Sequence, residues 1–381
     1  MWSRPLPKQY LKTTAIVNDL GPLYKTQDKD TATHLALSLN GRVRFIVPRE
    51  ADAQEACWKV FRPGKPRLPL RAMAFLRRFS GSMSCVESEV LTSIRKEIGK
   101  ESGRSCCRAG APGVWSKSTI LLLKKETAEP LCIVKTGSGE AVGSLLQNEA
   151  NWLRSLSEQG SLAAHIPEFF AHRPGADLSF VAESLLSGKI DPEFRECHFT
   201  FLQKLQQQSR QTMQFGNSQL YRNLHSRSAD LKGLLSAKWS SRLEMAMQRI
   251  EQSLSGSPTV MVAAHNDFAP WNIRIDHGVA TVFDWEYADY EQLPLFDPLH
   301  FTLAPMALKR RPVKTMVRGM KTTLQLSRQR LGKECCYEEQ MQAVAYLINL
   351  CTLYLWSVHG ESESNPVLES YSKLIDYLCQ C

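Results

Sequence analysis

Short apolar runs separated by turn residues dominate the first half of the chain and predict β-strands. Residues 34–48 (HLALSLNGRVRFIVP) alternate apolar and polar positions around Asn40-Gly41, a pattern that predicts a β-hairpin. From Ser105 onward, the runs CCRAG, STILLLKK and PLCIVK each predict a strand. Residues 178–188 (LSFVAESLLSG) predict a further strand that ends at a glycine turn. The first half of the chain is therefore expected to be rich in β-structure.

One predicted helix lies among these strands and carries a charge on its apolar face. In residues 141–156 (AVGSLLQNEANWLRSL), Val142, Leu146, Glu149 and Leu153 recur at helical spacing. The other members of this face are apolar, so the face is expected to pack in the core. A carboxylate buried with them requires a partner.

The second half of the chain has mainly helical periodicity. Helices are expected over residues 192–210, over residues 230–254 and in three segments after Leu303, and a strand pair over residues 273–283 interrupts them. This order predicts an α+β enzyme with two lobes, a small β-rich N-lobe and a larger helical C-lobe.

The domain boundaries follow from these changes in pattern. We expect an N-terminal extension with a β-hairpin over residues 1–104, the N-lobe over residues 105–187 and the helical C-lobe over residues 188–381. No chemistry can be read from the extension.

Composition and charge narrow the class of protein. The 381 residues are 43% hydrophobic and 22% charged, which is typical of a globular protein. The net charge of +9 suits either a polyanionic partner or a polyphosphate substrate, but the densest basic cluster is only Lys309-Arg310-Arg311. Binding to nucleic acid is therefore the less favoured interpretation.

The cysteines point to neither a metal site nor a secreted protein. None of the 11 cysteines forms a C-x-x-C pair, so a zinc site of the usual kind is not expected. The sequence contains no signal-peptide pattern at Met1 and no apolar run long enough to span a bilayer. These features predict a cytoplasmic protein whose cysteines are reduced and buried as small hydrophobic residues.

The candidate chemistry lies in residues 265–288, HNDFAPWNIRIDHGVATVFDWEYA. NIRI and VATVF alternate around Asp276-His277-Gly278, and such a hairpin brings Asp284 back beside Asn272 and Asp267. Oxygen ligands from one or two carboxylates, together with substrate phosphates, are how Mg²⁺ is usually held. A carboxylate apart from the metal ligands can accept the proton of an attacking hydroxyl, so the stretch predicts a phosphoryl-transfer site in outline.

HNDFAPWN followed by FDWE resembles the catalytic loop and metal-binding Asp of the aminoglycoside phosphotransferase and choline kinase group, which belongs to the protein-kinase-like superfamily. The resemblance covers the chain from about Ser105 to the C-terminus and implies a two-lobed protein-kinase-like fold. It implies that Asp267 is the catalytic base and that Asn272 and Asp284 are Mg²⁺ ligands. His265 would be a structural member of the loop, and PLFDPLHF (residues 294–301) resembles the family segment in which Asp297 is expected to brace the loop.

The same resemblance assigns roles to residues upstream. Lys135 would hold the α- and β-phosphates of ATP and be oriented by Glu149, which supplies the partner that the buried carboxylate requires. GAPGVW would cover the phosphates, with Ser116 and Lys117 as donors, and AESLLSG would be the hinge on which adenine rests, through the backbone of Glu183 to Leu185.

Two positions depart from the family pattern. GAPGVWS is not G-x-G-x-x-G, and Asn266 stands in the catalytic loop where glycine is common, which affects the expected backbone geometry. Neither departure removes a metal ligand.

Aromatic and histidine side chains near the loop allow two interpretations. Trp271, Trp285, Tyr287 and Tyr290 would form either an aromatic wall for a cationic acceptor or, as we favour, part of the core. Three further histidines have no partner spacing and are expected to be structural: His198, His225 and His300.

The functional hypothesis is an ATP- and Mg²⁺-dependent phosphotransferase that moves the γ-phosphoryl group to a hydroxyl of a small molecule. The acceptor would be an amino sugar, an amino alcohol or a sugar-like compound. Two other hypotheses are a catalytically silent kinase-like binding protein and, less favoured, a basic protein associated with nucleic acid.

Overall fold

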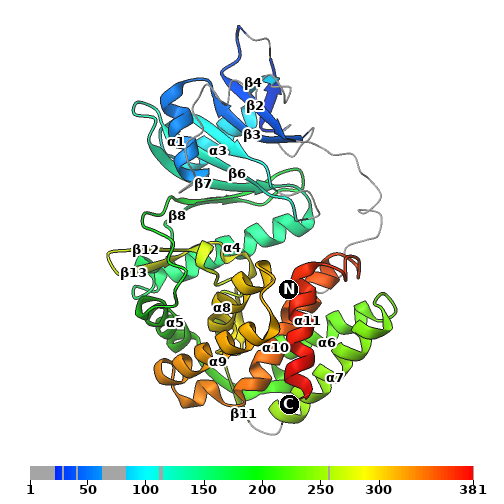
Figure 1. Cartoon of the computed structure of the whole chain (residues 1–381). Helices are drawn as coiled ribbons and strands as arrows, with labels where there is room; N and C mark the ends of the chain where they lie inside the picture. The colour runs from blue at the N-terminus through cyan, green and yellow to red at the C-terminus, as the bar shows by residue number, and fades with distance from the viewer. Residues whose placement is uncertain are drawn as a thin grey trace. The chain divides into compact units, whose positions relative to one another are not determined.

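The computed structural model describes residues 22–27, 30–39, 42–61, 83–110, 115–255 and 258–380, which belong to two compact units (Figure 1). The sheet unit contains the described residues up to Glu158 together with Pro167–Leu186. The helical unit contains Gln159–Ile166 and the chain from Ser187 onward. None of the described helices is long and apolar enough to span a bilayer.

The sheet unit is built on an antiparallel sheet of nine described strands in the order β1-β4-β2-β3-β5-β6-β7-β9-β8. The strands are β1 (Tyr24–Thr26), β2 (His34–Leu39), β3 (Arg42–Pro48), β4 (Met83–Glu87), β5 (Ser102–Arg108), β6 (Ser118–Lys124), β7 (Pro130–Gly137), β8 (Phe169–Arg173) and β9 (Ser179–Ser184). The helices are α1 (Ala51–Phe61), α3 (Glu89–Ile98) and α4 (Glu140–Glu158).

The predicted hairpin over residues 34–48 is confirmed, because β2 pairs with β3 in antiparallel register. Its turn residues, Asn40 and Gly41, lie outside the described residues. The hairpin is continuous with the rest of the sheet, since Phe45 and Ile46 of β3 pair with Arg108 and Cys107 of β5. Strands from residues before 105 and strands after it therefore form one sheet.

Both faces of the sheet are covered, which explains why β6 is apolar at successive positions. Ile120 and Leu122 pack into a cluster that includes Ile94 of α3, whereas Leu121 and Leu123 pack on the opposite face in a cluster with α1. Successive side chains of a strand point to opposite faces. A strand buried on both sides consequently loses the apolar–polar alternation of a half-exposed strand.

A disulfide joins Cys57 of α1 to Cys106 of β5 across a sequence separation of 49 residues. The expectation that the cysteines are reduced is therefore wrong for this pair, and spacing could not reveal it because the two residues meet only through the tertiary fold. Among the other cysteines whose side chains the structure describes, all are free and all but the half-buried Cys197 are buried. Burial raises the pKa of the Cys132 thiol to about 12, so this side chain behaves as a small hydrophobic group at neutral pH.

The helical unit combines helices with two small sheets. Its helices are α5 (Glu196–Ser209), α6 (Gln219–Leu231), α7 (Ala237–Leu254), α8 (Phe296–Leu308), α9 (Val313–Arg330), α10 (Glu339–Ser357) and α11 (Pro366–Gln380). Strands β10 (Gln211–Gln214), β11 (Pro258–Ala264) and β14 (Asp289–Gln292) form one sheet, and β12 (Ile273–Asp276) and β13 (Val279–Val282) form the other.

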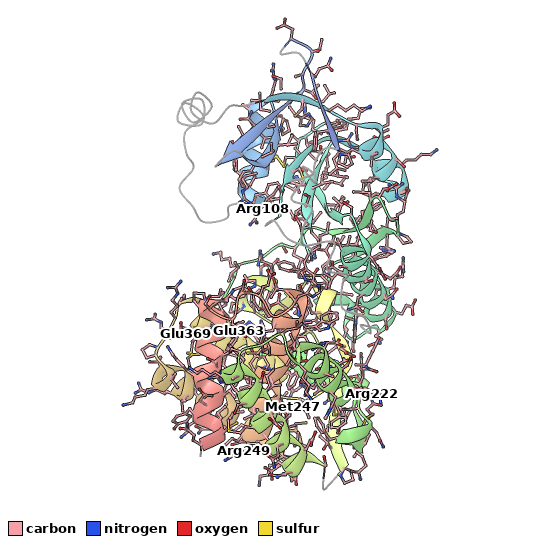
Figure 2. All side chains as sticks on the ribbon, turned by 90° about the vertical axis from the view of Figure 1, so that its right-hand side faces the viewer. Arg108, Arg222, Met247, Arg249, Glu363 and Glu369 are labelled. Atoms are coloured by element: carbon pink, nitrogen blue, oxygen red, sulfur yellow. A yellow bond between two sulfur atoms is a disulfide. The ribbon has the colours of Figure 1, made fainter. Side chains whose placement is uncertain are left out.

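The predicted helix boundaries differ most between α6 and α7. The sequence analysis placed one helix over residues 230–254, but α6 ends at Leu231 and α7 begins at Ala237. Gly233, at φ +79, lies in the connection, a conformation that ends a helix and favours glycine. The N-terminal end of α7 is linked to the segment after α10, because the Ser236 N–H donates to the Glu363 carboxylate at 2.6 Å. Figure 2 labels Glu363.

Helix α10 lies at the centre of the helical unit and contacts α6, α7, α8 and α11. Most of its side chains are buried, including the polar side chains of Gln342, Tyr346, Asn349 and Thr352. A helix that is buried all round places each polar group where it needs a hydrogen-bond partner. One hydrogen-bond partner of Tyr346, His300, lies at the candidate site.

Candidate active site

The β12–β13 hairpin places the ends of its two strands side by side. Ile273 pairs with Val282 and Asp276 with Val279, and the Phe283 N–H donates to the Asn272 carbonyl oxygen at 3.1 Å. The predicted hairpin is confirmed. Asn272 precedes one strand and Asp284 follows the other, so both lie at the open end of the hairpin.

Asp267 is in contact with Asn272 at this end. The Asn272 Nδ2 donates to the Asp267 carbonyl oxygen at 3.0 Å and to its Oδ2 at 2.7 Å. Because the amide nitrogen faces Asp267, the Oδ1 of Asn272 faces the other way. This orientation presents an oxygen of the kind that Mg²⁺ binds.

The backbone of the loop is held by Asp297 in the first turn of α8. Its Oδ2 accepts the His265 N–H at 2.8 Å and its Oδ1 accepts the Asn266 N–H at 2.9 Å, which is the bracing contact expected from the sequence. Burial raises the pKa of Asp297 to about 6, while the two backbone donors act in the opposite direction. The carboxylate thus fixes two successive peptide groups just before Asp267.

Asn266 occupies the position where the family commonly has glycine. Its backbone conformation explains why either glycine or asparagine can stand there. It adopts φ +61, a left-handed conformation that glycine adopts freely and that asparagine tolerates better than most residues. Its Nδ2 also donates to the Tyr287 carbonyl oxygen at 3.0 Å, which links the loop to the segment after Asp284. The departure therefore preserves the backbone geometry.

His265 joins the loop at residues 265–272 to the β12–β13 hairpin as a neutral side chain. Its Nδ1 accepts the Asp267 N–H at 3.2 Å, and its Nε2 then donates to the Phe283 carbonyl oxygen at 3.0 Å. Burial lowers the pKa of His265 to about 4, so the imidazole is uncharged at neutral pH. These contacts fit the structural role that the sequence assigned to it.

The aromatic residues around the loop divide between core and surface. Trp285 is fully buried, stacks edge-on against His265 and donates from its Nε1 to the Val282 carbonyl oxygen at 2.9 Å. Trp271 and Tyr290 are 37% and 47% exposed. Trp285 therefore belongs to the core, Tyr287 is half-buried, and Trp271 and Tyr290 are exposed.

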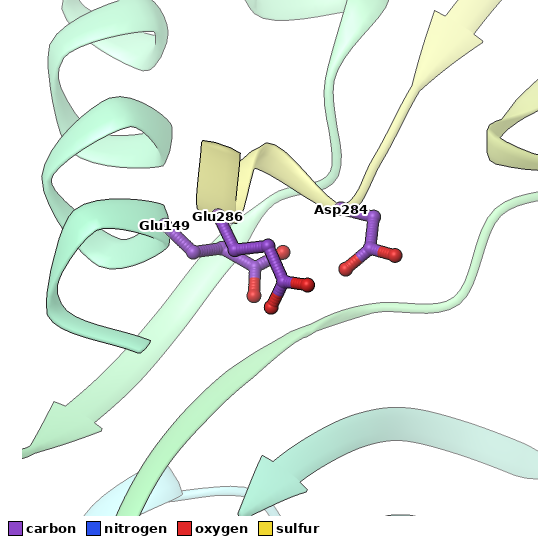
Figure 3. A group of neighbouring side chains, drawn as sticks. All are labelled: Glu149, Asp284 and Glu286. Carbon is purple, nitrogen blue, oxygen red and sulfur yellow. The ribbon is translucent and has the colours of Figure 1, made fainter. Parts of the chain in front are cut away.

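Asp284 and Glu286 present two carboxylates from one short segment (Figure 3). Asp284 adopts φ +75 and ψ +53, an uncommon conformation for a residue with a side chain. One carboxylate oxygen of Asp284 lies within 4.8 Å of one from the buried Glu286. Such a set of hard oxygen donors, together with Oδ1 of Asn272, fits Mg²⁺, and Glu286 is a member that the sequence analysis did not single out.

His300 is the second residue that the sequence analysis missed. Its Nε2 lies 2.9 Å from the Asp267 Oδ1, a contact that the expectation of a structural histidine did not include. Asp297 and His300 lie one turn apart on α8. This spacing puts both on one helix face and was the available signal, because the sequence already pointed to Asp297.

The candidate phosphate-binding residues of the sheet unit form an ion network. The Lys135 Nζ at the end of β7 lies 2.5 Å from the Glu149 Oε1 and 3.2 Å from the Glu183 Oε1. Val142, Leu146 and Leu153 are buried with Glu149 on one face of α4, as predicted. The Glu183 carboxylate was missed, because the sequence analysis assigned only the backbone of this residue.

The structure describes only some of the other residues that were predicted to contact ATP. Ser116 and Lys117 directly precede β6, and residues 111–114 of the expected phosphate loop lie outside the described residues. The Ser184 N–H at the expected hinge donates to the Glu168 carbonyl oxygen at 2.9 Å. Leu185 packs against the cluster that contains Leu121 and Leu123.

Comparisons with known proteins agree with the resemblance read from the loop. Residues 115–318 match the profile of a family described as "Phosphotransferase enzyme family". Among solved structures, aminoglycoside phosphotransferase APH(4)-Ia in a ternary complex with ADP and hygromycin B is 11% identical, with a TM-score of 0.52 over 77% of this chain and 98% of that chain. Choline kinase LicA from Streptococcus pneumoniae is 14% identical, with a TM-score of 0.51 over 77% of this chain and all of that chain (100%).

These likenesses to solved structures show the kinase-like fold. No curated protein gives a significant match to the sequence. The predicted α+β, protein-kinase-like fold class is confirmed.

Proposed function

The chain belongs to the phosphotransferase enzyme family, and from that premise we propose that it transfers the γ-phosphoryl group of ATP to a hydroxyl of a small molecule with the help of Mg²⁺. The observation that carries the proposal is the convergence of Asp267, Asn272 and Asp284 at the open end of the β12–β13 hairpin. Lys135, Glu149 and Asp267 follow one another along the chain in the order that kinase-like phosphoryl transfer requires of its lysine, glutamate and base.

In the proposed reaction, Asp267 accepts a hydrogen bond from the acceptor hydroxyl and takes its proton as the new O–P bond forms. The bond between the γ-phosphorus and the β,γ-bridging oxygen breaks, and ADP leaves with that oxygen. Asp267 is suited to this step because its carboxylate is fixed by donors from Asn272 and His300. Positioning and charge stabilisation supply most of the rate in such transfers.

The other assigned residues bind and orient ATP. Lys135 holds the α- and β-phosphates and is itself oriented by Glu149 and Glu183. Asn272 and Asp284 provide ligands for Mg²⁺, which when bound neutralises charge on the phosphates. Ser116 and Lys117 are proposed as further phosphate donors, and the backbone of Glu183 to Leu185 as the seat of adenine.

The acceptor is proposed to carry an amine as well as the reacting hydroxyl. Asp284, Glu286 and Asp267 give this part of the helical unit a negative character, and Trp271 and Tyr290 expose aromatic rings nearby in the sequence. Aromatic faces attract organic cations. Amino sugars and amino alcohols meet both requirements, and use of ATP favours the cytoplasm as the location.

A thermal-unfolding measurement tests the nucleotide and metal part of the proposal. Mg·ATP at a hundred times its dissociation constant should stabilise the wild type by about 2.7 kcal/mol. For a chain of this length the midpoint should rise by a few degrees. Asp284→Ala should abolish the Mg²⁺-dependent part of the rise, because it removes a carboxylate ligand.

Asp276→Asn is the matched control, since Asp276 lies at the turn of the same hairpin and its Oδ2 accepts a hydrogen bond from Ser187. This variant should keep the full rise. An equal rise with and without Mg²⁺ in the wild type would contradict the metal assignment.

Phosphoryl transfer is then measured with choline and hygromycin B as the first two acceptor probes, followed by other amino alcohols and amino sugars. Formation of a phosphorylated acceptor and of one ADP for each acceptor supports the proposal. Binding of Mg·ATP without transfer to any member of these classes would instead establish a catalytically silent binding protein.

A further inference from the structure

His300 contacts the carboxylate that we propose as the catalytic base. Its Nε2 lies 2.9 Å from the Asp267 Oδ1, and the His300 side chain is 8% exposed against 25% for that of Asp267. We propose that His300 is a positioning residue, which holds the Asp267 carboxylate in the orientation that accepts the proton of the acceptor hydroxyl. This inference rests on the proposed phosphotransferase function.

The two oxygens of Asp267 are held by different residues. Oδ2 accepts a hydrogen bond from the Asn272 Nδ2 at 2.7 Å, and Oδ1 faces His300. Rotation about the bond to a carboxyl group is otherwise broad, because this torsion joins sp³ and sp² atoms. One anchor at each oxygen fixes the plane of the carboxylate. Each ionised oxygen has a second lone pair, so capacity remains to receive the substrate proton.

The hydrogen bonds define which nitrogen of His300 carries the proton. An ionised carboxylate oxygen can only accept, so the Nε2 donates to Asp267. In a neutral imidazole the Nδ1 is then an acceptor, and it lies 3.2 Å from the Tyr346 hydroxyl on α10. Tyr346 therefore donates to His300 and fixes the tautomer that serves Asp267.

The chain of hydrogen bonds continues into the C-terminal helix. Tyr346 is hydrogen-bonded to Tyr371 on α11, and both side chains are buried. Burial raises the pKa of both phenols above the usual range, so both keep their protons at neutral pH and can donate. Helices α8, α10 and α11 thus support one carboxylate through His300, Tyr346 and Tyr371.

Two residues of α8, Asp297 and His300, hold different parts of the loop. Asp297 accepts the backbone N–H groups of His265 and Asn266, and so fixes the main chain of the catalytic loop. His300, one turn further along the helix, fixes the side chain of Asp267. A shift of the α8 start would therefore disturb both the loop and its base.

The test compares His300→Leu with His300→Gln in the full chain, using Mg·ATP with water as the acceptor and ADP release as the readout, and then an acceptor that the wild type phosphorylates. His300→Leu removes the donor, and kcat should fall on the order of tenfold to a hundredfold, as expected for a small misplacement of a reacting group. The KM for ATP should stay within about threefold, because ATP is not bound by His300.

His300→Gln supplies an amide N–H close to the position of the imidazole Nε2 and should recover most of kcat. Tyr346→Phe leaves His300 in place but removes the donor to its Nδ1, so a smaller loss of about threefold to tenfold is expected. A role in folding alone predicts a different pattern, in which both His300 variants lose the thermal rise with Mg·ATP in parallel with activity.

The outcomes separate the inference from the proposed function. If Asp267→Asn inactivates the enzyme but His300→Leu keeps kcat within about twofold of the wild type, the positioning role is wrong and the phosphotransferase proposal stands. Equal losses in folded His300→Leu and His300→Gln would also overturn the inference. If the wild type itself transfers no phosphoryl group to water or to any acceptor, the proposed function fails and the role of His300 fails with it.

Discussion

The loop at residues 265–272 of the helical unit and the Lys135 network of the sheet unit both stabilise buried carboxylates, but they do so by different interactions. In the loop, Asp297 accepts two backbone N–H groups, and His265 is neutral at the centre of the hydrogen bonds. In the network, Glu149 and Glu183 both pair with the Lys135 ammonium group. The loop is held by directional bonds, and the network by charge.

The difference indicates which kind of substitution should affect each region. Directional bonds from neutral donors depend on the shape of each group and on its protonation state. A buried ion network depends on charge balance, because a charge left without its partner is costly in a medium of low polarity. Substitutions that conserve shape should therefore affect the two regions differently.

Asp267→Asn is expected to give the largest effect. It keeps the shape of the side chain but removes the ability to take a proton, so kcat should fall on the order of a thousandfold, within the range for loss of a general base. Such a fall corresponds to about 4 kcal/mol in the activation barrier. Initial rates of ADP formation with a confirmed acceptor measure it.

Urea unfolding should show a folded Asp267→Asn variant that is less stable than the wild type by about 1–3 kcal/mol, because its amide NH2 replaces an oxygen that accepts from Asn272 or His300. A variant that retains more than about a tenth of wild-type kcat would show that another group takes the proton.

Lys135→Met is the corresponding change in the network, and it acts on stability. It removes a cation that pairs with both Glu149 and Glu183, whose side chains are 0% and 4% exposed. Breaking a buried ion pair from one side costs about 3–5 kcal/mol. Denaturant unfolding should show this loss, and adding Glu149→Gln should recover part of it, because the excess negative charge is reduced.

Lys124→Met is the matched control on β6. Lys124 also pairs with a glutamate, Glu129, but the two side chains are 51% and 61% exposed. Exposed pairs contribute little to stability, because water screens both charges. If Lys124→Met and Lys135→Met lose the same stability, charge balance in the interior is not what holds the network.

The sequence foretold those parts of the two regions that depend on local pattern. Residues 273–282 alternate around a turn, and the structure has the hairpin there; Glu149 recurs with apolar residues at helical spacing, and it is buried. The spacing of Asp267, Asn272 and Asp284 required only this hairpin to bring them to one end. Local periodicity was sufficient for these features.

The missed features depend on packing between distant segments. His300 reaches Asp267 from a later helix, and the side chain of Glu183 reaches Lys135 across the β7–β9 pairing. The Cys57–Cys106 bond depends on how α1 lies on the sheet. Neither periodicity nor composition specifies which elements become neighbours. The Glu183 and cysteine contacts therefore had no signal in the separate segments, and the only signal for His300 was its spacing from Asp297 on α8.

Acid should weaken the helical unit through its neutral histidines. Burial lowers the pKa of His198 and His265 to about 4, below the unfolded value of 6.5. Their contribution to stability is therefore fully present above pH 6.5 and is lost as the pH falls toward about 4. For each histidine the free energy of unfolding should drop by about 2 kcal/mol between pH 6.5 and pH 5.

His198→Asn tests this dependence because the Nδ1 of His198 accepts the Arg195 N–H at 2.9 Å, and the asparagine oxygen can replace that acceptor. The variant should lose less stability on acidification than the wild type. His277→Asn is the control, since the His277 side chain is 97% exposed at the hairpin turn, and it should follow the wild-type curve. Asp297 acts in the opposite sense, because its raised pKa of about 6 makes its contribution fade as the pH rises toward 6.

Asn266 gives the smallest expected effect and isolates backbone geometry from hydrogen bonding within the loop. Asn266→Gly keeps the left-handed φ of +61 accessible but removes the bond to the Tyr287 carbonyl oxygen, for a cost of about 1 kcal/mol. Asn266→Ala loses the same bond and must also hold a left-handed backbone with a β-carbon, which adds about 1 kcal/mol. Urea unfolding of the two variants should therefore rank glycine above alanine. If Asn266→Ala is at least as stable as Asn266→Gly, the side-chain hydrogen bond and not the backbone conformation governs this position. The directional bonds of the loop would then include the residue directly before Asp267.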